Sequence, residues 1–154
     1  MQTILFLCTG NYYRSRYAEL LFNELAQRAG LGWRAASRGL FVKEGVNPGP
    51  IAKPTLTALA DAGIVPPAAD IERYPAQVSE AELAGAAIVV ALKEAEHRPL
   101  LAASYPGWKD RVIYWHIHDL DKASPAEALG EIDRLVREVV AELATDSEPM
   151  TNGR

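Results

Sequence analysis

Near the start of the chain, one cysteine and one arginine are separated by five residues. Cys8 is the only cysteine, and Arg14 follows it after a short polar stretch. The thiolate form of cysteine is a strong nucleophile, whereas the thiol is weak and free cysteine has a pKa of about 8.5. Arginine presents a planar fork of N–H groups that fits two oxygens of one phosphate. The pair therefore indicates a site where cysteine attacks phosphorus while arginine holds the phosphate.

The residues between them are typical of a phosphate-binding loop. An apolar run ends just before Cys8, and a helical pattern begins at Ser15. The first N–H groups of a helix lack backbone partners and carry a partial positive charge, so they stabilise a thiolate and a phosphate dianion. Gly10 permits the backbone angles that turn N–H groups inward, and Asn11 is the next most tolerant of a left-handed conformation. Ser15 can donate a hydrogen bond to the sulfur.

We expect Cys8 and Arg14 to be catalytic. The residues expected to bind phosphate are consecutive: Thr9, Gly10, Asn11, Tyr12, Tyr13, Arg14 and Ser15. The alternative is a buried structural cysteine, which is the commoner role of an isolated cysteine. The Cys-x5-Arg-Ser spacing, the Gly-Asn pair and the strand and helix predicted on either side together favour the phosphate loop.

Short apolar runs alternate with helical patterns along the whole chain. The runs that predict strands are Thr3–Leu7, Trp33–Gly39, Ala86–Leu92 and Arg111–Trp115. Apolar residues at helical spacing predict helices over about 15–30, 54–63, 79–85, 94–103 and 124–143, with Pro99 limiting or kinking the fourth. Ser79 with Glu82 and Ser124 with Glu127 form the sequence pattern of a capping box. Residues 64–75 contain three prolines and are expected to be mostly loop.

This order predicts a three-layer α/β fold, with a four-stranded parallel sheet and helices on both faces. We expect one domain over residues 1–144 and a loose, polar C-terminal tail over 145–154. Open parallel sheets bind ligands at the carboxyl ends of their strands. Cys8 lies at that end of the first predicted strand.

The composition narrows the class of protein. The 154 residues are 49% hydrophobic and 23% charged, which is ordinary for a soluble domain. A net charge of -4 argues against a nucleic-acid partner, and no run approaches the roughly 18 apolar residues of a membrane span. One cysteine gives no intrachain disulfide, and the N-terminus lacks the pattern of a secretion signal. We therefore expect a cytoplasmic protein.

The loop resembles that of the low-molecular-weight protein tyrosine phosphatase family, which shares its phosphate cradle with thioredoxin-coupled arsenate reductases. The family pattern is Cys-x-Gly-Asn-x-x-Arg-Ser, and this chain has each of its fixed residues. The resemblance continues to about Leu143, including Ser37-x-Gly39 and Gln77-Val78-Ser79-Glu80. It implies a sheet order of 2-1-3-4, a cysteinyl-phosphate intermediate, no cofactor and a monomer. It also implies phosphorylated protein, phosphotyrosine above all, or a small aryl phosphate as substrate, with inorganic phosphate as a further ligand.

The resemblance also implies an aspartate that protonates the leaving oxygen and then activates water. The family carries it between the last strand and the last helix, so we assign Asp119, with Asp121 as the alternative. Without the resemblance, both would be ordinary loop carboxylates. His116 and His118 lie two apart, but this pair is a weak indication of a metal site and we expect none.

The chain departs from the family pattern at several positions. Tyr13 stands where the family often carries a second cysteine, and Lys93 where it commonly has aspartate after the third strand. Lys93 indicates either a rewired set of contacts behind the site or a basic group at its rim. The residues after Asp119 lack the proline and aromatics that wall a phenyl ring. Tyr12, Tyr13 and Phe41 are candidates for a replacement wall.

Two other functions stay open. A single cysteine excludes the thioredoxin-coupled reductase but not an arsenate reductase that uses an external thiol. The second alternative is a module that binds phosphate or phosphoprotein without turnover, to which Lys93 and the altered acid loop point.

Overall fold

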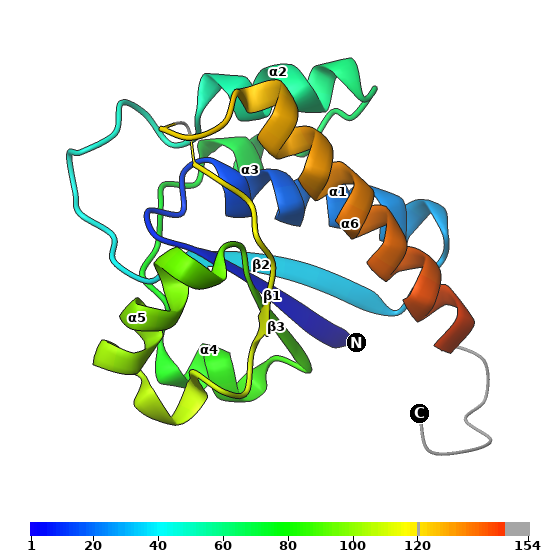
Figure 1. Ribbon diagram of the computed structural model, residues 1–154. Helices are drawn as coiled ribbons and strands as arrows, with labels where there is room; N and C mark the ends of the chain where they lie inside the picture. Colours follow the sequence, from blue (N-terminus) through cyan, green and yellow to red (C-terminus); the bar gives the residue numbers. More distant parts are fainter. Residues whose placement is uncertain (120, 147–154) are drawn as a thin grey trace.

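A computed structural model describes residues 1–119 and 121–146 of the chain. Its sheet has four parallel strands in the order β2-β1-β3-β4 (Figure 1). Their bounds are Gln2–Cys8 for β1, Trp33–Gly39 for β2, Ile88–Ala91 for β3 and Ile113–Tyr114 for β4. The predicted fold class and strand order are confirmed.

The helices cover both faces of this sheet. They are α1 (Arg14–Arg28), α2 (Lys53–Asp61), α3 (Ala68–Glu72), α4 (Glu80–Gly85), α5 (Glu94–Ser104) and α6 (Pro125–Asp146), with a 3₁₀ turn over Pro106–Trp108. Helices α1, α2 and α6 pack against one another on one face, while α4 and α5 lie on the other (Figure 1). Helix α1 follows β1 directly, so the loop between them lies at the carboxyl end of a central strand.

The apolar run of β1 is explained by burial on both of its faces. Ile4 and Phe6 belong to the core cluster beneath α1 and α6, and the Phe6 ring packs against Phe22. Leu5 and Leu7 belong to the second cluster, beneath α4 and α5. A strand covered on both sides gains from apolar residues at every position. This double burial anchors the strand that ends at Cys8.

Several element bounds differ from the sequence predictions. Strands β3 and β4 are shorter than predicted, and α3 lies within the segment 64–75 that was expected to be mostly loop. Pro67 precedes α3 with φ −56°, close to the helical value that proline imposes, which favours a helix start there. Helix α5 continues past Pro99 to Ser104. Helix α6 extends to Asp146, so the prediction of a loose tail over 145–154 is wrong for residues 145 and 146. Residues 147–154 lie outside the described residues.

Both predicted capping boxes are present. The Ser79 hydroxyl accepts from the Glu82 N–H at 3.1 Å, and the Glu82 carboxylate accepts from the Ser79 N–H at 2.9 Å. Ser124 and Glu127 make the same reciprocal pair at the start of α6. These caps fix where α4 and α6 begin. No helix among the described residues is long and apolar enough to cross a membrane.

Candidate active site

The predicted phosphate loop joins the end of β1 to the start of α1. Tyr13, the residue just before α1, makes no side-chain hydrogen bond that caps this helix. The first turn of α1 contains no acidic residue. Neither the Tyr13 side chain nor a carboxylate of the first turn therefore accepts hydrogen bonds from the first N–H groups of α1. A helix start in this condition suits an anion.

The shape of the loop depends on Asn11, whose φ is 52° in the left-handed region. Its amide donates to the hydroxyls of Ser15 and Ser37, each at 2.9 Å. Its carbonyl oxygen accepts from Arg73 and from the Ala76 N–H, each at 3.1 Å. The fully buried side chain is thus bonded on both sides. These bonds offset the strain of a left-handed backbone at a residue other than glycine.

Gly10 does not have the role that the sequence suggested, because the left-handed residue of this loop is Asn11. The glycine required by close approach is Gly39, at the end of β2. A Cβ atom there would lie 2.4 Å from Val42 Cγ2 and 2.8 Å from the Thr9 carbonyl oxygen. Gly39 therefore allows β2 and the following loop to pack directly against the phosphate loop.

Ser15 lies beside the cysteine as predicted, with Oγ 2.9 Å from Cys8 Sγ. The same Ser15 oxygen accepts a hydrogen bond from Asn11. Because that bond occupies a lone pair, the hydroxyl proton is available to point toward the sulfur. Ser15 is thus placed to donate to the cysteine sulfur.

A second layer of charged residues holds the loop from behind, and the sequence reasoning missed it. The Ser37 hydroxyl donates to Glu19 at 2.6 Å and accepts from Arg73 at 3.1 Å. Arg73 also donates to Glu19 at 3.2 Å. A salt-bridged arginine from the segment after α3 therefore connects α1, β2 and the phosphate loop.

Arg16 is fully buried and donates to backbone carbonyls of the loop before α2 and of the α3 region. Its partners are Pro50 at 3.2 Å, Arg73 at 2.9 Å and Asp70. Burial, together with repulsion from Arg73, lowers the pKa of Arg16 to about 10, so it keeps its charge at neutral pH. Arg16 therefore holds the loop before α2 and the α3 region against the start of α1.

Arg14 is held on the other side of the loop. Its Nη1 donates to the Ile117 carbonyl oxygen at 2.8 Å, and its Nη2 donates to Glu96 at 2.8 Å. The carboxylate of Asp119 lies 3.5 Å from the same Nη2. Glu96 was not predicted, although the missing aspartate at Lys93 was a reason to look for another carboxylate nearby. Lys93 itself precedes α5 and lines neither of the two cavities described next.

The predicted catalytic residues share one small cavity. Its volume is about 240 Å³, and it is lined by Cys8, Thr9, Gly10, Tyr12, Tyr13, Arg14, Asn47, Ala52, Asp119 and Asp121. Of the predicted phosphate-binding residues, Asn11 and Ser15 lie outside this lining, because both are fully buried behind the loop. The structure thus brings the thiol, the guanidinium and both candidate acids around one space.

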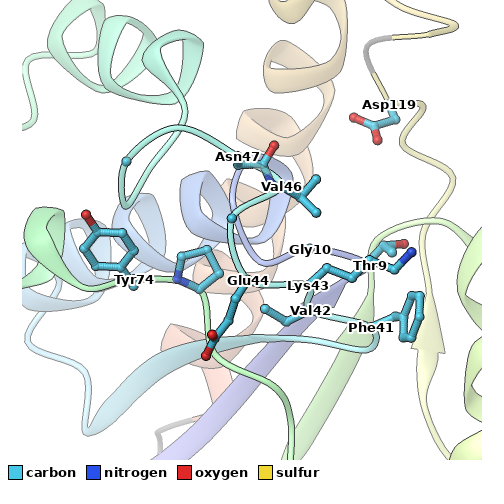
Figure 2. Close-up of a pocket in the computed structure, with 13 residues that line it drawn as sticks. Thr9, Gly10, Phe41, Val42, Lys43, Glu44, Val46, Asn47, Tyr74 and Asp119 are labelled. Carbon is cyan, nitrogen blue, oxygen red and sulfur yellow. The ribbon is translucent and has the colours of Figure 1, made fainter.

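A larger cleft opens beside this cavity. Its volume is about 650 Å³, and its lining includes the segment 41–47 as well as Tyr74, Thr9 and Gly10. Figure 2 shows Asp119 on one side of the cleft, across from the 41–47 segment and Tyr74. Asp119 lines both the small cavity and the larger cleft, so it lies where the two meet.

The three aromatic residues named from the sequence are placed differently. Tyr13 is 6% exposed and packs in the core, where burial raises the pKa of its phenol to about 12. Tyr12 is half-buried, and its hydroxyl donates to the Pro48 carbonyl at 2.6 Å. Phe41 is 54% exposed and lines the cleft. Tyr13 therefore packs mainly with the core, which leaves Tyr12 and Phe41 as the more accessible aromatics.

Comparison with known proteins assigns the class. Residues 3–146 match the family described as low molecular weight phosphotyrosine protein phosphatase, and the chain belongs to this family. The protein-arginine-phosphatase of Bacillus subtilis (strain 168) is 29% identical over 110 residues, which cover 71% of this chain and 67% of that protein. The chain is therefore a phosphatase.

Solved structures show the same fold. A low molecular weight protein tyrosine phosphatase from T. tengcongensis superposes with a TM-score of 0.75 at 25% identity, covering 92% of this chain and 99% of that one. The YwlE arginine phosphatase from Geobacillus stearothermophilus gives a TM-score of 0.75 at 22% identity, with both chains fully covered. A mutant of the YwlE arginine phosphatase with a phosphorylated active-site serine gives 0.77 at 23% identity, over 95% of this chain and 98% of that one.

Proposed function

We propose that this protein removes phosphate from phosphotyrosine in proteins, with Cys8 as nucleophile, Arg14 as phosphate clamp and Asp119 as acid and base. The observation that carries the proposal is the shared cavity, in which all three side chains meet. Residues 8–15 form the phosphate-binding loop. The phosphate would lie between the sulfur and the guanidinium.

The reaction follows from these positions. The sulfur attacks phosphorus while the bond from phosphorus to the tyrosine oxygen breaks, and Asp119 gives its proton to that oxygen. Arg14 and the N–H groups at the start of α1 stabilise the charge on the equatorial oxygens. In the second step Asp119 takes a proton from water, which attacks phosphorus and displaces the sulfur. Ser15 donates to the departing sulfur, and inorganic phosphate leaves.

Asp119 suits the acid better than Asp121. Only Asp119 lines both the cavity and the cleft, so it lies at the boundary that the scissile bond must cross. Its Oδ2 is also 3.5 Å from Arg14 Nη2. Asp121 lines the small cavity but not the cleft.

The cleft supports an aromatic leaving group. Phe41 and Val46 are well exposed along it, and Tyr74 is 65% exposed at its other side. Apolar and aromatic surface of this kind favours a phenyl ring over a fully solvated side chain. The wall that relatives build after their acid would here come from the 41–47 segment.

A second candidate substrate is phosphoarginine. It is favoured by the 29% identity to a protein-arginine-phosphatase and by the carboxylate of Glu44 in the cleft lining. A guanidine leaving group is cationic when protonated, so a carboxylate in the cleft would attract it.

We also propose that the protein acts in the cytoplasm as a monomer. A nucleophilic thiol must stay reduced to function, and the cytoplasm keeps thiols reduced.

The test compares two peptides of one sequence that differ only in phosphotyrosine or phosphoarginine. We expect kcat/KM to be at least about tenfold higher for phosphotyrosine, because the cleft wall is mainly apolar. Cys8→Ser should abolish turnover of both peptides, since a serine hydroxyl is a far weaker nucleophile. A higher kcat/KM for phosphoarginine would favour the second candidate. Hydrolysis that survives Cys8→Ser would refute the mechanism.

A further inference from the structure

One oxygen of Glu96 joins two distant points of the phosphate loop. Glu96 lies in the first turn of α5, and its Oε2 accepts from Arg14 Nη2 at 2.8 Å. The same oxygen accepts from the Thr9 hydroxyl. Thr9 directly follows the cysteine, whereas Arg14 is at the other end of the loop. A single carboxylate therefore fixes the separation between these two ends.

The imidazole of His97 lies next to this carboxylate. The ring is fully buried, and its Nδ1 accepts the Lys93 N–H at 2.9 Å. Burial lowers the pKa of His97, so the neutral ring carries its proton on Nε2. That nitrogen lies 3.2 Å from Glu96 Oε2, close but without the alignment of a good hydrogen bond. The dipole of the ring thus favours the ionised carboxylate in this place.

Glu96 keeps its charge beside the cradle. Its partial burial opposes ionisation, but the contacts from His97, Arg14 and Thr9 outweigh it, and the pKa of Glu96 lies well below the usual range. The Arg14 guanidinium is consequently held from two directions, by Glu96 and by the Ile117 carbonyl. Its remaining N–H groups are left for phosphate oxygens.

We propose that Glu96 is a positioning residue, which holds Arg14 and Thr9 in the geometry that binds the transferring phosphate. This inference rests on the proposed role of Arg14 as phosphate clamp. It also accounts for Lys93, because Glu96 in the first turn of α5 supplies a carboxylate in place of the aspartate that the family resemblance led us to expect at position 93. A misplaced clamp costs catalysis because transition-state oxygens must meet N–H groups that are already in place.

The experiment compares Glu96→Ala, Glu96→Gln and Glu96→Asp in the full chain. Glu94→Ala is the matched control, since Glu94 lies on the same helical turn but pairs with the surface residue Arg98. The measurements are kcat and KM with p-nitrophenyl phosphate, the affinity for inorganic phosphate by calorimetry, and the melting temperature.

We expect Glu96→Ala to lower kcat by about 10- to 100-fold and to weaken phosphate binding about tenfold. Glu96→Gln keeps an acceptor oxygen at the same reach and should stay within about fivefold of the wild type. Glu96→Asp keeps the charge but is one methylene too short to serve both partners, so its kcat should fall about tenfold. The control should match the wild type.

The opposite pattern overturns the inference. If Glu96 acted only as a nearby negative charge, the Ala and Gln variants would both bind phosphate more tightly than the wild type. Equal losses in the Gln and Ala variants would likewise refute positioning. Should Glu96→Ala fail to fold, the difference in kcat between Glu96→Gln and Glu96→Asp decides whether Glu96 is a positioning residue. If the wild type binds phosphate but hydrolyses no ester, the proposed function fails, while the phosphate affinities still decide the role of Glu96.

Discussion

The phosphate loop between β1 and α1 and the acid loop between β4 and α6 provide the two halves of the proposed site. In the phosphate loop, Asn11 and Ser15 are fully buried and hydrogen-bonded to each other. In the acid loop, the Asp119 side chain is 46% exposed, whereas its partner Arg14 is 3% exposed. The backbone carbonyl of Asp119 accepts from the Lys122 and Ala123 N–H groups, which form the turn.

This contrast teaches where each kind of effect should occur. The half that binds phosphate is fixed before substrate arrives, and its buried groups leave little freedom to adjust. In the other half, Trp115 and Ile117 are buried in the core, but the Asp119 and Asp121 side chains are half exposed or exposed and carry little of the folding energy. Changes in the phosphate loop should therefore affect stability and activity together, while changes at these two carboxylates should affect activity alone.

Asp119→Ala provides the largest test of this contrast. We expect kcat for phenyl phosphate to fall by about 100- to 1,000-fold, because the leaving oxygen loses its proton donor. The melting temperature should stay close to that of the wild type, since the side chain is half exposed. Asp121→Ala is the matched control and should change kcat less than about threefold. A larger loss in Asp121→Ala would transfer the acid role to that residue.

Asn11→Ala should instead damage both properties. It removes a side chain that makes four hydrogen bonds. We expect the free energy of unfolding to fall by roughly 2–4 kcal/mol and kcat/KM by at least about tenfold. Chemical denaturation and steady-state kinetics provide the two measurements.

Asn11→Gly separates the hydrogen bonds from the backbone strain at the same position. Glycine adopts φ 52° without cost, so this variant should be about 1 kcal/mol more stable than Asn11→Ala. Equal stability of the two variants would mean that the loop relaxes out of the left-handed conformation.

Arg73→Ala probes the layer behind the loop. It removes the donor to Asn11, Ser37 and Glu19, and we expect a loss of about 1–3 kcal/mol in the free energy of unfolding. Arg28→Ala is the control, because its pair with Glu24 is on the surface and should contribute less than about 1 kcal/mol. Similar losses in both variants would show that the buried layer adds no more than a surface pair.

The smallest expected effect concerns pH. Because the pKa of Glu96 is depressed in the folded state, the unfolded chain binds more protons as the pH falls. The contribution of Glu96 to stability is then complete above its ordinary pKa and is lost as the pH falls toward the folded value. Denaturation between about pH 6 and pH 3 should show a smaller loss of stability in Glu96→Gln than in the wild type. Parallel curves would contradict the depressed pKa.

Much of the cradle was predictable because its residues are neighbours in sequence. Cys8, Asn11, Arg14 and Ser15 come from one loop, so a strand end followed by a helix start is enough to bring them together. The continuous apolar run before Cys8 likewise predicts a strand buried on both faces. Local preference failed at Gly10, because hydrogen bonds to the side chain made Asn11 the left-handed residue. It failed again at α3, where prolines that break a helix from within instead precede one.

The sequence alone determined the parallel α/β fold, and it identified Cys8 and Arg14 as the proposed nucleophile and phosphate clamp, since periodicity and short spacing carry these inferences. Only the tertiary structure decided what holds that arginine. Glu96 is 82 residues from Arg14, and Ile117 is 103 residues away. Contacts over such separations depend on how α5 and the segment after β4 are placed at the carboxyl ends of the strands. The position of Arg14 and the contacts that hold it therefore depend on three segments that meet at the carboxyl ends of β1, β3 and β4, and no single segment determines them.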